Sequence, residues 1–257
     1  MRNLCALGSF CLFLFSLLLI PSLSCNSKGK EEKEAAKNLL TALEDALETG
    51  DLSKTDFPDT PTGRMAKIVS ELIRGMLNTQ KEFEEKIYKL DLDWMFSDEA
   101  LSSKENLKEC LRRTDLFLDY AKDSQVKTNQ LIDNSLKELE KQSTQSKEAK
   151  EFYLGFKSSF FDPVEGSKAT FDESNKLIIN YHLSLKEYFS FLLNNLGNYT
   201  VKEGEVTFNP NVKSYIKNEF ERISNNLFDT TDALIEFEER QYERARQKID
   251  EAKKIIK

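Results

Sequence analysis

The chain has 257 residues, of which 32% are charged and 39% hydrophobic, with only 9 Gly and 5 Pro. This balance is typical of a folded, helix-rich domain and excludes collagen-like and disordered chains. The formal net charge is −7 and acidic and basic residues are interspersed. Nucleic acid is therefore not expected as a partner, because binding to phosphates requires clustered Lys and Arg.

The N-terminus has the order of a secretory signal. Arg2 gives a positive start, residues 4–20 carry no charge, and Pro21 and small residues come just before Cys25. We therefore predict a signal peptide over residues 1–24, since a helix-breaking proline and small residues are features of a cleavage site. The alternative is an uncleaved transmembrane helix, because about 17 to 20 apolar residues approach the length that spans a bilayer.

The four cysteines divide between the signal peptide and the rest of the chain. Cys5 and Cys11 lie inside the predicted signal peptide, so Cys25 and Cys110 remain after cleavage. Two cysteines do not make a disulfide framework, although a single bridge between them is conceivable. Cys110 lies on an apolar helical stripe with Leu107. We expect its thiol to be a small core group, because free cysteines are among the most buried residues.

The segment Ser22-Leu23-Ser24-Cys25 resembles the lipobox of bacterial lipoproteins, although Ser22 stands where Leu is usual. The resemblance implies that Cys25 is acylated and becomes the first residue after cleavage. Several acyl chains anchor a protein stably in a membrane, whereas one chain is marginal. We therefore expect a lipidated Cys25 followed by a polar tether over residues 25–33. Asn26 stands where Asp would retain a lipoprotein in the inner membrane, which favours the outer membrane.

Beyond residue 31, apolar residues recur at spacings of three and four, which predicts helices nearly everywhere. Long helices joined by short turns bury their apolar stripes by lying side by side. The predicted fold is therefore all-α, an elongated bundle of about four to six antiparallel helices that forms a single domain over residues 34–257. The expected helices cover residues 36–47, 64–90, 103–142, 152–160, 171–196 and 211 to the C-terminus, the last with a repeat close to seven residues, and residues 51–63 form a loop.

One stretch alternates with period two, over residues 199–208. A Glu203-Gly204 turn would place two apolar pairs on one face of a β-hairpin. Such a hairpin is marginal alone, so we expect it to dock on the helices. The alternative is a plain loop between helices. The predicted cross-strand pairs are Val201 with Val206 and Tyr199 with Phe208.

The order of lipobox, long helices, the insert GNYTVKEGEVTFNP and a final long helix resembles the helical YiaF-type lipoproteins of Gram-negative bacteria. These proteins have a comparable hydrophobic-turn-hydrophobic insert before the last helix. No functional residue carries over, because the activity of that family is unknown. The Lys-, Asn- and Phe-rich composition also resembles the helical surface lipoproteins of Borrelia-like spirochaetes, and this resemblance implies binding to host proteins.

The sequence carries no recognisable catalytic motif. His182 is the only histidine, so neither a pair of Glu-x-x-His motifs for a di-iron centre nor a second histidine for catalysis is available. The acidic stretch Asp91–Glu99 lacks the Gly and the later Glu of a calcium loop and is expected to be a solvated turn. We therefore predict no enzymatic activity, no cofactor, no metal and no small-molecule substrate.

The aromatic residues near position 156 are too closely spaced for one narrow stripe. Phe152, Phe156 and Phe160 share a helix face, which indicates core packing. Tyr153 and Phe161 fall beside that face. We hypothesise that these two rings form an exposed patch that binds a partner.

Together these features predict a lipid-anchored, non-catalytic envelope lipoprotein. The expected role is a protein-interaction module on or under the outer membrane, where it binds host or envelope proteins. Two alternatives are a periplasm-facing structural or accessory lipoprotein and a carrier of an apolar ligand in the bundle interior.

Overall fold

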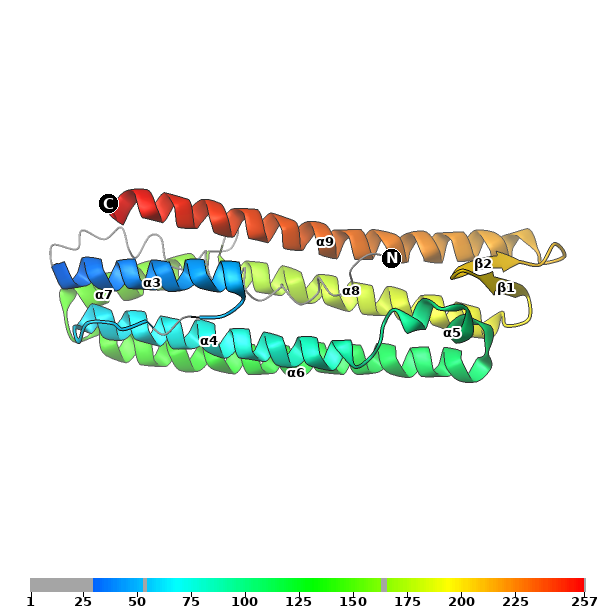
Figure 1. Cartoon of the computed structure of the whole chain (residues 1–257), viewed down its shortest axis with the longest axis horizontal. Coiled ribbons are helices and arrows are strands. Elements are labelled where there is room, and N and C mark those ends of the chain that lie inside the picture. The colour runs from blue at the N-terminus through cyan, green and yellow to red at the C-terminus, as the bar shows by residue number, and fades with distance from the viewer. Residues whose placement is uncertain (1–29, 53–54, 163–165, 257) are drawn as a thin grey trace. The chain divides into compact units, whose positions relative to one another are not determined.

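The computed structural model describes residues 30–52, 55–162 and 166–256 (Figure 1). The predicted signal peptide and Cys25 lie outside these residues. Among these described residues, 81% are helical, and they form seven α-helices and a small antiparallel hairpin before the last helix, which confirms the all-α prediction with its β insert. The elements are α3 (Lys30–Thr49), α4 (Pro61–Tyr88), the 3-10 helix η2 (Trp94–Phe96), α5 (Asp98–Ser102), α6 (Lys104–Ser143), α7 (Lys147–Phe160), α8 (Ser167–Asn194), β1 (Tyr199–Lys202), β2 (Glu205–Phe208) and α9 (Ser214–Ile256).

The helix ends follow from local capping residues. Gly50 has φ +69°, and its N–H donates to the carbonyl of Ala46 at 3.1 Å, which closes α3 where the sequence predicts a stop. Helix α4 begins at Pro61, three residues earlier than predicted. The Thr60 hydroxyl accepts the N–H of Gly63 at 3.0 Å, and a proline is well tolerated in the first turn because its missing N–H has no helical partner.

Helix α3 starts inside the predicted tether. The predicted polar tether runs to residue 33, whereas the helix begins at Lys30. Residues 30–36 consist of Lys, Glu and Ala, which are strong helix formers, so the helix begins at the first of them. Four residues lie between Cys25 and the described helix.

The described residues group into two compact units, each with its own core. We call Phe83–Asp123 together with Ser174–Glu236 the hairpin unit. The α7 unit contains the described residues up to Glu82, Ser124–Glu173 and the end of the chain from Phe237. The units are described separately below, and a single domain over residues 34–257 stays a prediction.

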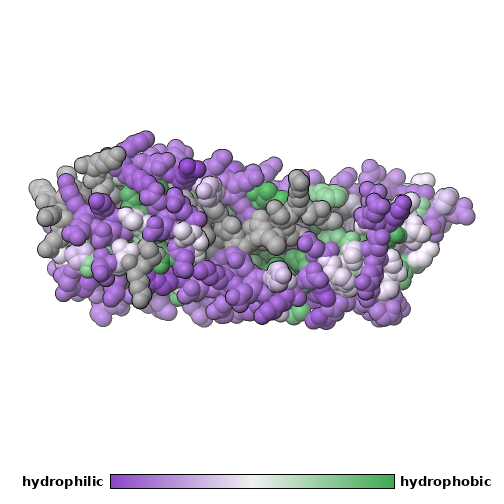
Figure 2. Space-filling view, in the orientation of Figure 1, coloured by the Kyte–Doolittle hydropathy of each residue, from purple (hydrophilic) through white to green (hydrophobic). Residues whose placement is uncertain are grey.

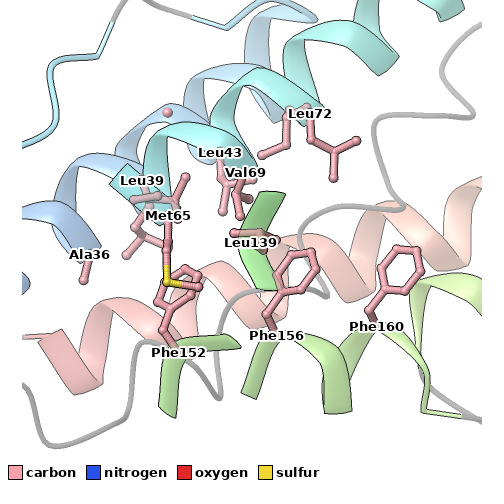
Figure 3. Close-up of a cluster of buried hydrophobic side chains, with 14 of the residues drawn as sticks. Ala36, Leu39, Leu43, Met65, Val69, Leu72, Leu139, Phe152, Phe156 and Phe160 are labelled. Atoms are coloured by element: carbon pink, nitrogen blue, oxygen red, sulfur yellow. The ribbon is translucent and has the colours of Figure 1, made fainter. Parts of the chain in front are cut away.

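The core of the α7 unit is built on the aromatic face of α7. Phe152, Phe156 and Phe160 are buried, as the spacing predicts, and the rings of Phe156 and Phe160 stack with centroids 6.0 Å apart. Figure 3 shows these rings facing aliphatic side chains from three other helices. Those partners are Leu39 and Leu43 of α3, Met65, Val69 and Leu72 of α4, and Leu139 of α6.

The hairpin of the other unit has the predicted register. Tyr199 pairs with Phe208 and Val201 with Val206. Glu203 and Gly204 both have positive φ, +55° and +77°, as a two-residue type I′ turn requires. The hairpin docks on the helices of its unit, as expected, because its rings join an aromatic cluster. Close ring pairs there include Phe208 with Phe220 at 5.2 Å, Phe96 with Phe189 at 5.5 Å and Tyr188 with Phe189 at 5.4 Å.

Candidate functional surfaces

The thiol of Cys110 is part of the core of the hairpin unit, as the sequence predicts. It is fully buried, and its Sγ lies 3.7 Å from the carbonyl oxygen of Met95. Burial raises the pKa of this thiol to about 12. Because the thiolate is the nucleophilic form of cysteine, the group is chemically inert at neutral pH.

His182 is also a packing residue, which confirms its predicted place. It is buried in α8, with its Nδ1 3.1 Å from the carbonyl oxygen of Thr114 on α6. Burial lowers the pKa of the imidazole, against smaller raising effects of the Thr114 carbonyl and Asp115. The ring is therefore neutral near pH 7, with Nδ1–H donating to the carbonyl. This contact ties α8 to α6.

Asp98, from the predicted acidic turn, binds the hairpin. Its Oδ2 accepts the N–H of Glu203 at 3.0 Å and its Oδ1 accepts the N–H of Gly204 at 2.6 Å. Two successive backbone N–H groups at positive φ form a concave site for an anionic group, and here a carboxylate of the same chain fills it. Among the residues described, no three His, Cys, Asp or Glu side chains gather as metal ligands would.

The structure separates the two rings of the predicted partner-binding patch. Tyr153 is only 8% exposed and belongs to the core of the α7 unit, whereas Phe161 is 47% exposed. Tyr153 therefore does not offer the exposed ring that the hypothesis needs. Leu154, which the sequence reasoning passed over, is 53% exposed. It lies seven residues before Phe161, a spacing that places both side chains on one side of the helix.

Two lysines accompany these apolar side chains. Lys150 and Lys157 are exposed and lie four residues before Leu154 and four residues before Phe161. We call Lys150, Leu154, Lys157 and Phe161 the α7 stripe. It combines two cationic and two apolar side chains along one side of α7, with Phe161 directly after the helix end.

A second pair of exposed apolar side chains lies on α8 in the hairpin unit. Ile179 and Leu183 are one helical turn apart and are 42% and 56% exposed. Lys186 follows in the next turn, where its Nζ is 2.8 Å from Oδ1 of Asp115, so its charge is already paired. We call Ile179 and Leu183 the α8 pair. Figure 2 shows apolar residues set among hydrophilic ones on one face.

A buried carboxyl in the α7 unit was not predicted. Glu238 of α9 is 8% exposed, and Gln241, one turn on, is also buried. Within the described part of the chain, neither Oε1 atom has a hydrogen-bond partner. Burial raises the pKa of Glu238 to about 8. The sequence does contain a signal for this burial. Glu238 and Gln241 follow the buried Leu234 by four and seven residues, which places them on the apolar side of the last helix.

The described helices were compared with the requirements for crossing a membrane, and the whole chain was compared with known proteins. Across residues 30–52, 55–162 and 166–256, none of the helices has the length and apolar character needed to span a bilayer. Searches against protein-family models, curated proteins and solved structures found no match to this chain.

Proposed function

We propose that the protein is a lipid-anchored, non-catalytic envelope protein whose helical part contacts other proteins on or under an outer membrane. The observation that carries the proposal is the Ser22-Leu23-Ser24-Cys25 segment behind an uncharged run, followed within five residues by the first described helix. A diacylglyceryl group and an N-acyl chain on Cys25 would hold the helical part at the membrane, since several acyl chains give stable anchoring.

Labelling with radioactive palmitate tests the anchor. The wild-type protein expressed in a bacterial host should incorporate label and remain with the membrane fraction. Cys25→Ser should lose both, because it removes the thiol that is acylated. Cys110→Ser is the matched control, since that thiol lies in the core. Equal labelling of wild type and Cys25→Ser would overturn the anchor.

The contacts of Cys110 and His182 support a non-catalytic role. The Cys110 thiol is buried and protonated at neutral pH, and the His182 ring is held by a backbone carbonyl. Both groups are engaged in packing their unit, so neither is presented to a substrate. The interiors of both units hold large side chains, among them Phe117 and Phe156, which favours an interaction module over a carrier of an apolar ligand.

The α8 pair is the candidate contact for a protein partner. Two adjacent aliphatic side chains that are half exposed gain free energy when a partner buries them. A photo-crosslinking amino acid at position 183 should give a discrete crosslinked product in intact cells. The same group at Asn225, an exposed position of the same unit, is the control. Equal crosslinking at both positions would remove the α8 pair as a specific contact.

Protease treatment of intact cells assigns the side of the membrane. Loss of the protein indicates display on the cell surface, where host proteins are the accessible partners. Protection that ends when the outer membrane is permeabilised indicates the periplasmic face, where envelope proteins are the partners. Both outcomes are compatible with an interaction module, and they select between its two classes of partner.

A further inference from the structure

The α7 stripe is held on the surface of its unit by the core behind it. Its four members are separated by four, three and four residues, which keeps them on one side of a helix with 3.6 residues per turn. The buried rings of Phe152, Phe156 and Phe160 fix the rotation of α7 about its axis. The ring of Phe161 rests edge-on against the ring of Phe160, with centroids 4.9 Å apart. The backbone N–H of Phe161 donates to the Lys157 carbonyl at 3.0 Å. The exposed side of this ring is therefore set by packing.

The charges of α7 are sorted around the helix. Lys150 and Lys157 lie within the stripe, whereas Glu148 and Glu151 fall on a different side. The carboxylate of Glu151 lies 3.8 Å from the Nζ of Lys147, so its negative charge is balanced within α7. The stripe thus presents cationic and apolar groups without an acid between them. Long lysine stems lie along apolar surface while their charged ends reach polar groups, which is the arrangement found at a membrane interface.

The start of α7 lies at the same end of its unit as the start of α3. Both helices contribute to one core, and in Figure 3 the series Ala36, Leu39, Leu43 and the series Phe152, Phe156, Phe160 run in the same direction. Figure 1 shows the beginnings of both helices together. The chain therefore enters the unit, at Lys30, at the end where α7 begins.

The reach of that segment matches the length of the stripe. Four residues lie between Cys25 and Lys30, so the two residues are five steps apart and an extended chain spans at most about 18 Å between them. Lys150 and Phe161 are eleven steps apart along the helix, and at a rise of 1.5 Å per step the stripe is about 16 Å long. An acylated Cys25 therefore stays within about one stripe length of the start of α3, at the end of the unit where α7 also begins.

We propose that the α7 stripe is a second membrane contact, which lays the α7 unit on the anionic headgroups of the membrane that holds Cys25. The inference rests on the proposed lipid anchor, since two lysines and two apolar side chains are too few to bind a soluble domain to a membrane. Anchoring makes the contact intramolecular, and the resulting effective concentration turns a weak interaction into a populated one.

Tryptophan quenching by brominated lipids tests the contact. Leu154→Trp and the matched control Glu148→Trp place the probe on two sides of the same helix, against the common background of Trp94, the only native tryptophan. The lipidated proteins are reconstituted in vesicles of phosphatidylcholine with about 30% phosphatidylglycerol. The added emission of Leu154→Trp should fall about twofold with bromine in the acyl chains, and that of Glu148→Trp should stay unchanged.

The dependence on charge provides a second readout. Adding Lys150→Glu and Lys157→Glu to the Leu154→Trp protein should abolish the quenching, as should vesicles of phosphatidylcholine alone, because both changes remove the attraction of lysine to anionic headgroups. Unquenched emission from a protein that still floats with the vesicles would overturn the contact and leave the stripe to a protein partner.

Failure of the anchor gives a different result. If wild type and Cys25→Ser take up palmitate equally and neither floats, the proposed function fails. The chain from residue 25 onward is then coupled to a maleimide lipid through the Cys25 thiol, while the Cys110 thiol is buried. Quenching of Leu154→Trp in that attached protein still decides whether the stripe contacts the headgroups.

Discussion

Asp98 and Gly204 are 106 residues apart in the chain and are joined by a hydrogen bond of 2.6 Å, from the Gly204 N–H to Oδ1 of Asp98. The same carboxylate accepts the N–H of Glu203. A side chain in the first turn of α5 thus satisfies two backbone donors at the tip of the hairpin. The Asp98 carboxylate therefore holds the short helix α5 and the turn of the hairpin together.

Replacing Asp98 with alanine should destabilise the hairpin unit. The change leaves two backbone N–H groups without their acceptor, and hydrogen bonds to a charged group contribute about 1.5 to 3 kcal/mol each before solvent exposure reduces the value. We expect a loss of about 1 to 2 kcal/mol in chemical denaturation. Glu99→Ala, at the next exposed position, is the control, and an equal loss in both variants would contradict the role of Asp98.

Gly204→Ala should cost more stability than Gly197→Ala. Both glycines have positive φ, +77° and +90°, so either alanine meets the strain of a left-handed backbone, about 1 kcal/mol. A Cβ at position 204 would also lie 3.1 Å from the carbonyl oxygen of Phe96, whereas nothing lies within 4 Å at position 197. The difference between the two melting temperatures measures this contact. Equal shifts would mean that the Phe96 carbonyl moves aside freely.

Phe156→Ala and Phe161→Ala separate the buried side of the α7 region from its exposed side. Phe156 is fully buried, and removing a buried phenylalanine ring costs about 3 to 5 kcal/mol. Phe161 is half exposed, so its removal should cost less than about 1 kcal/mol. Urea denaturation followed by circular dichroism measures both values. A large loss in Phe161→Ala would show that this ring serves the core instead of the surface.

The buried Glu238 should make stability fall as the pH rises. Its pKa is about 8 in the folded chain and near 4.5 when unfolded, so between these values the folded state holds a proton that the unfolded state has lost. Unfolding is then favoured by rising pH, at a slope on the order of 1 kcal/mol per pH unit, and the effect is complete above pH 8.

Glu238→Gln removes this titration. The variant should be more stable than the wild type at a pH above 8, and the advantage should shrink steadily toward a pH of 4.5. The difference between the two proteins cancels the titration of all other groups. Parallel stability curves across this range would show that the carboxyl reaches water in the folded protein.

Most of the fold could be predicted because its local signals agree. The spacing of apolar residues, the stop at Gly50 and the paired hydrophobic residues around Glu203-Gly204 each point to the structure that forms. The two compact units could not be predicted, because α4, α6, α8 and α9 each contribute residues to both, and no change of composition marks the boundary.

The candidate surfaces were harder to predict because they depend on small rotations of a helix. Tyr153 and Leu154 are adjacent residues of similar apolar character, and only the packing of α7 decides which one is buried. Asp98 appeared to be part of a solvated turn, since nothing near it in the sequence indicates that residues 203 and 204 provide its partners.

The burial of Cys110 has a consequence for disulfide formation. Thiol–disulfide exchange requires an accessible thiolate, and this sulfur is both covered and protonated at neutral pH. Once the hairpin unit has folded, Cys110 is withdrawn from exchange with glutathione, with oxidoreductases and with Cys25. The bridge between Cys25 and Cys110 that the sequence leaves open then requires the hairpin unit to unfold first.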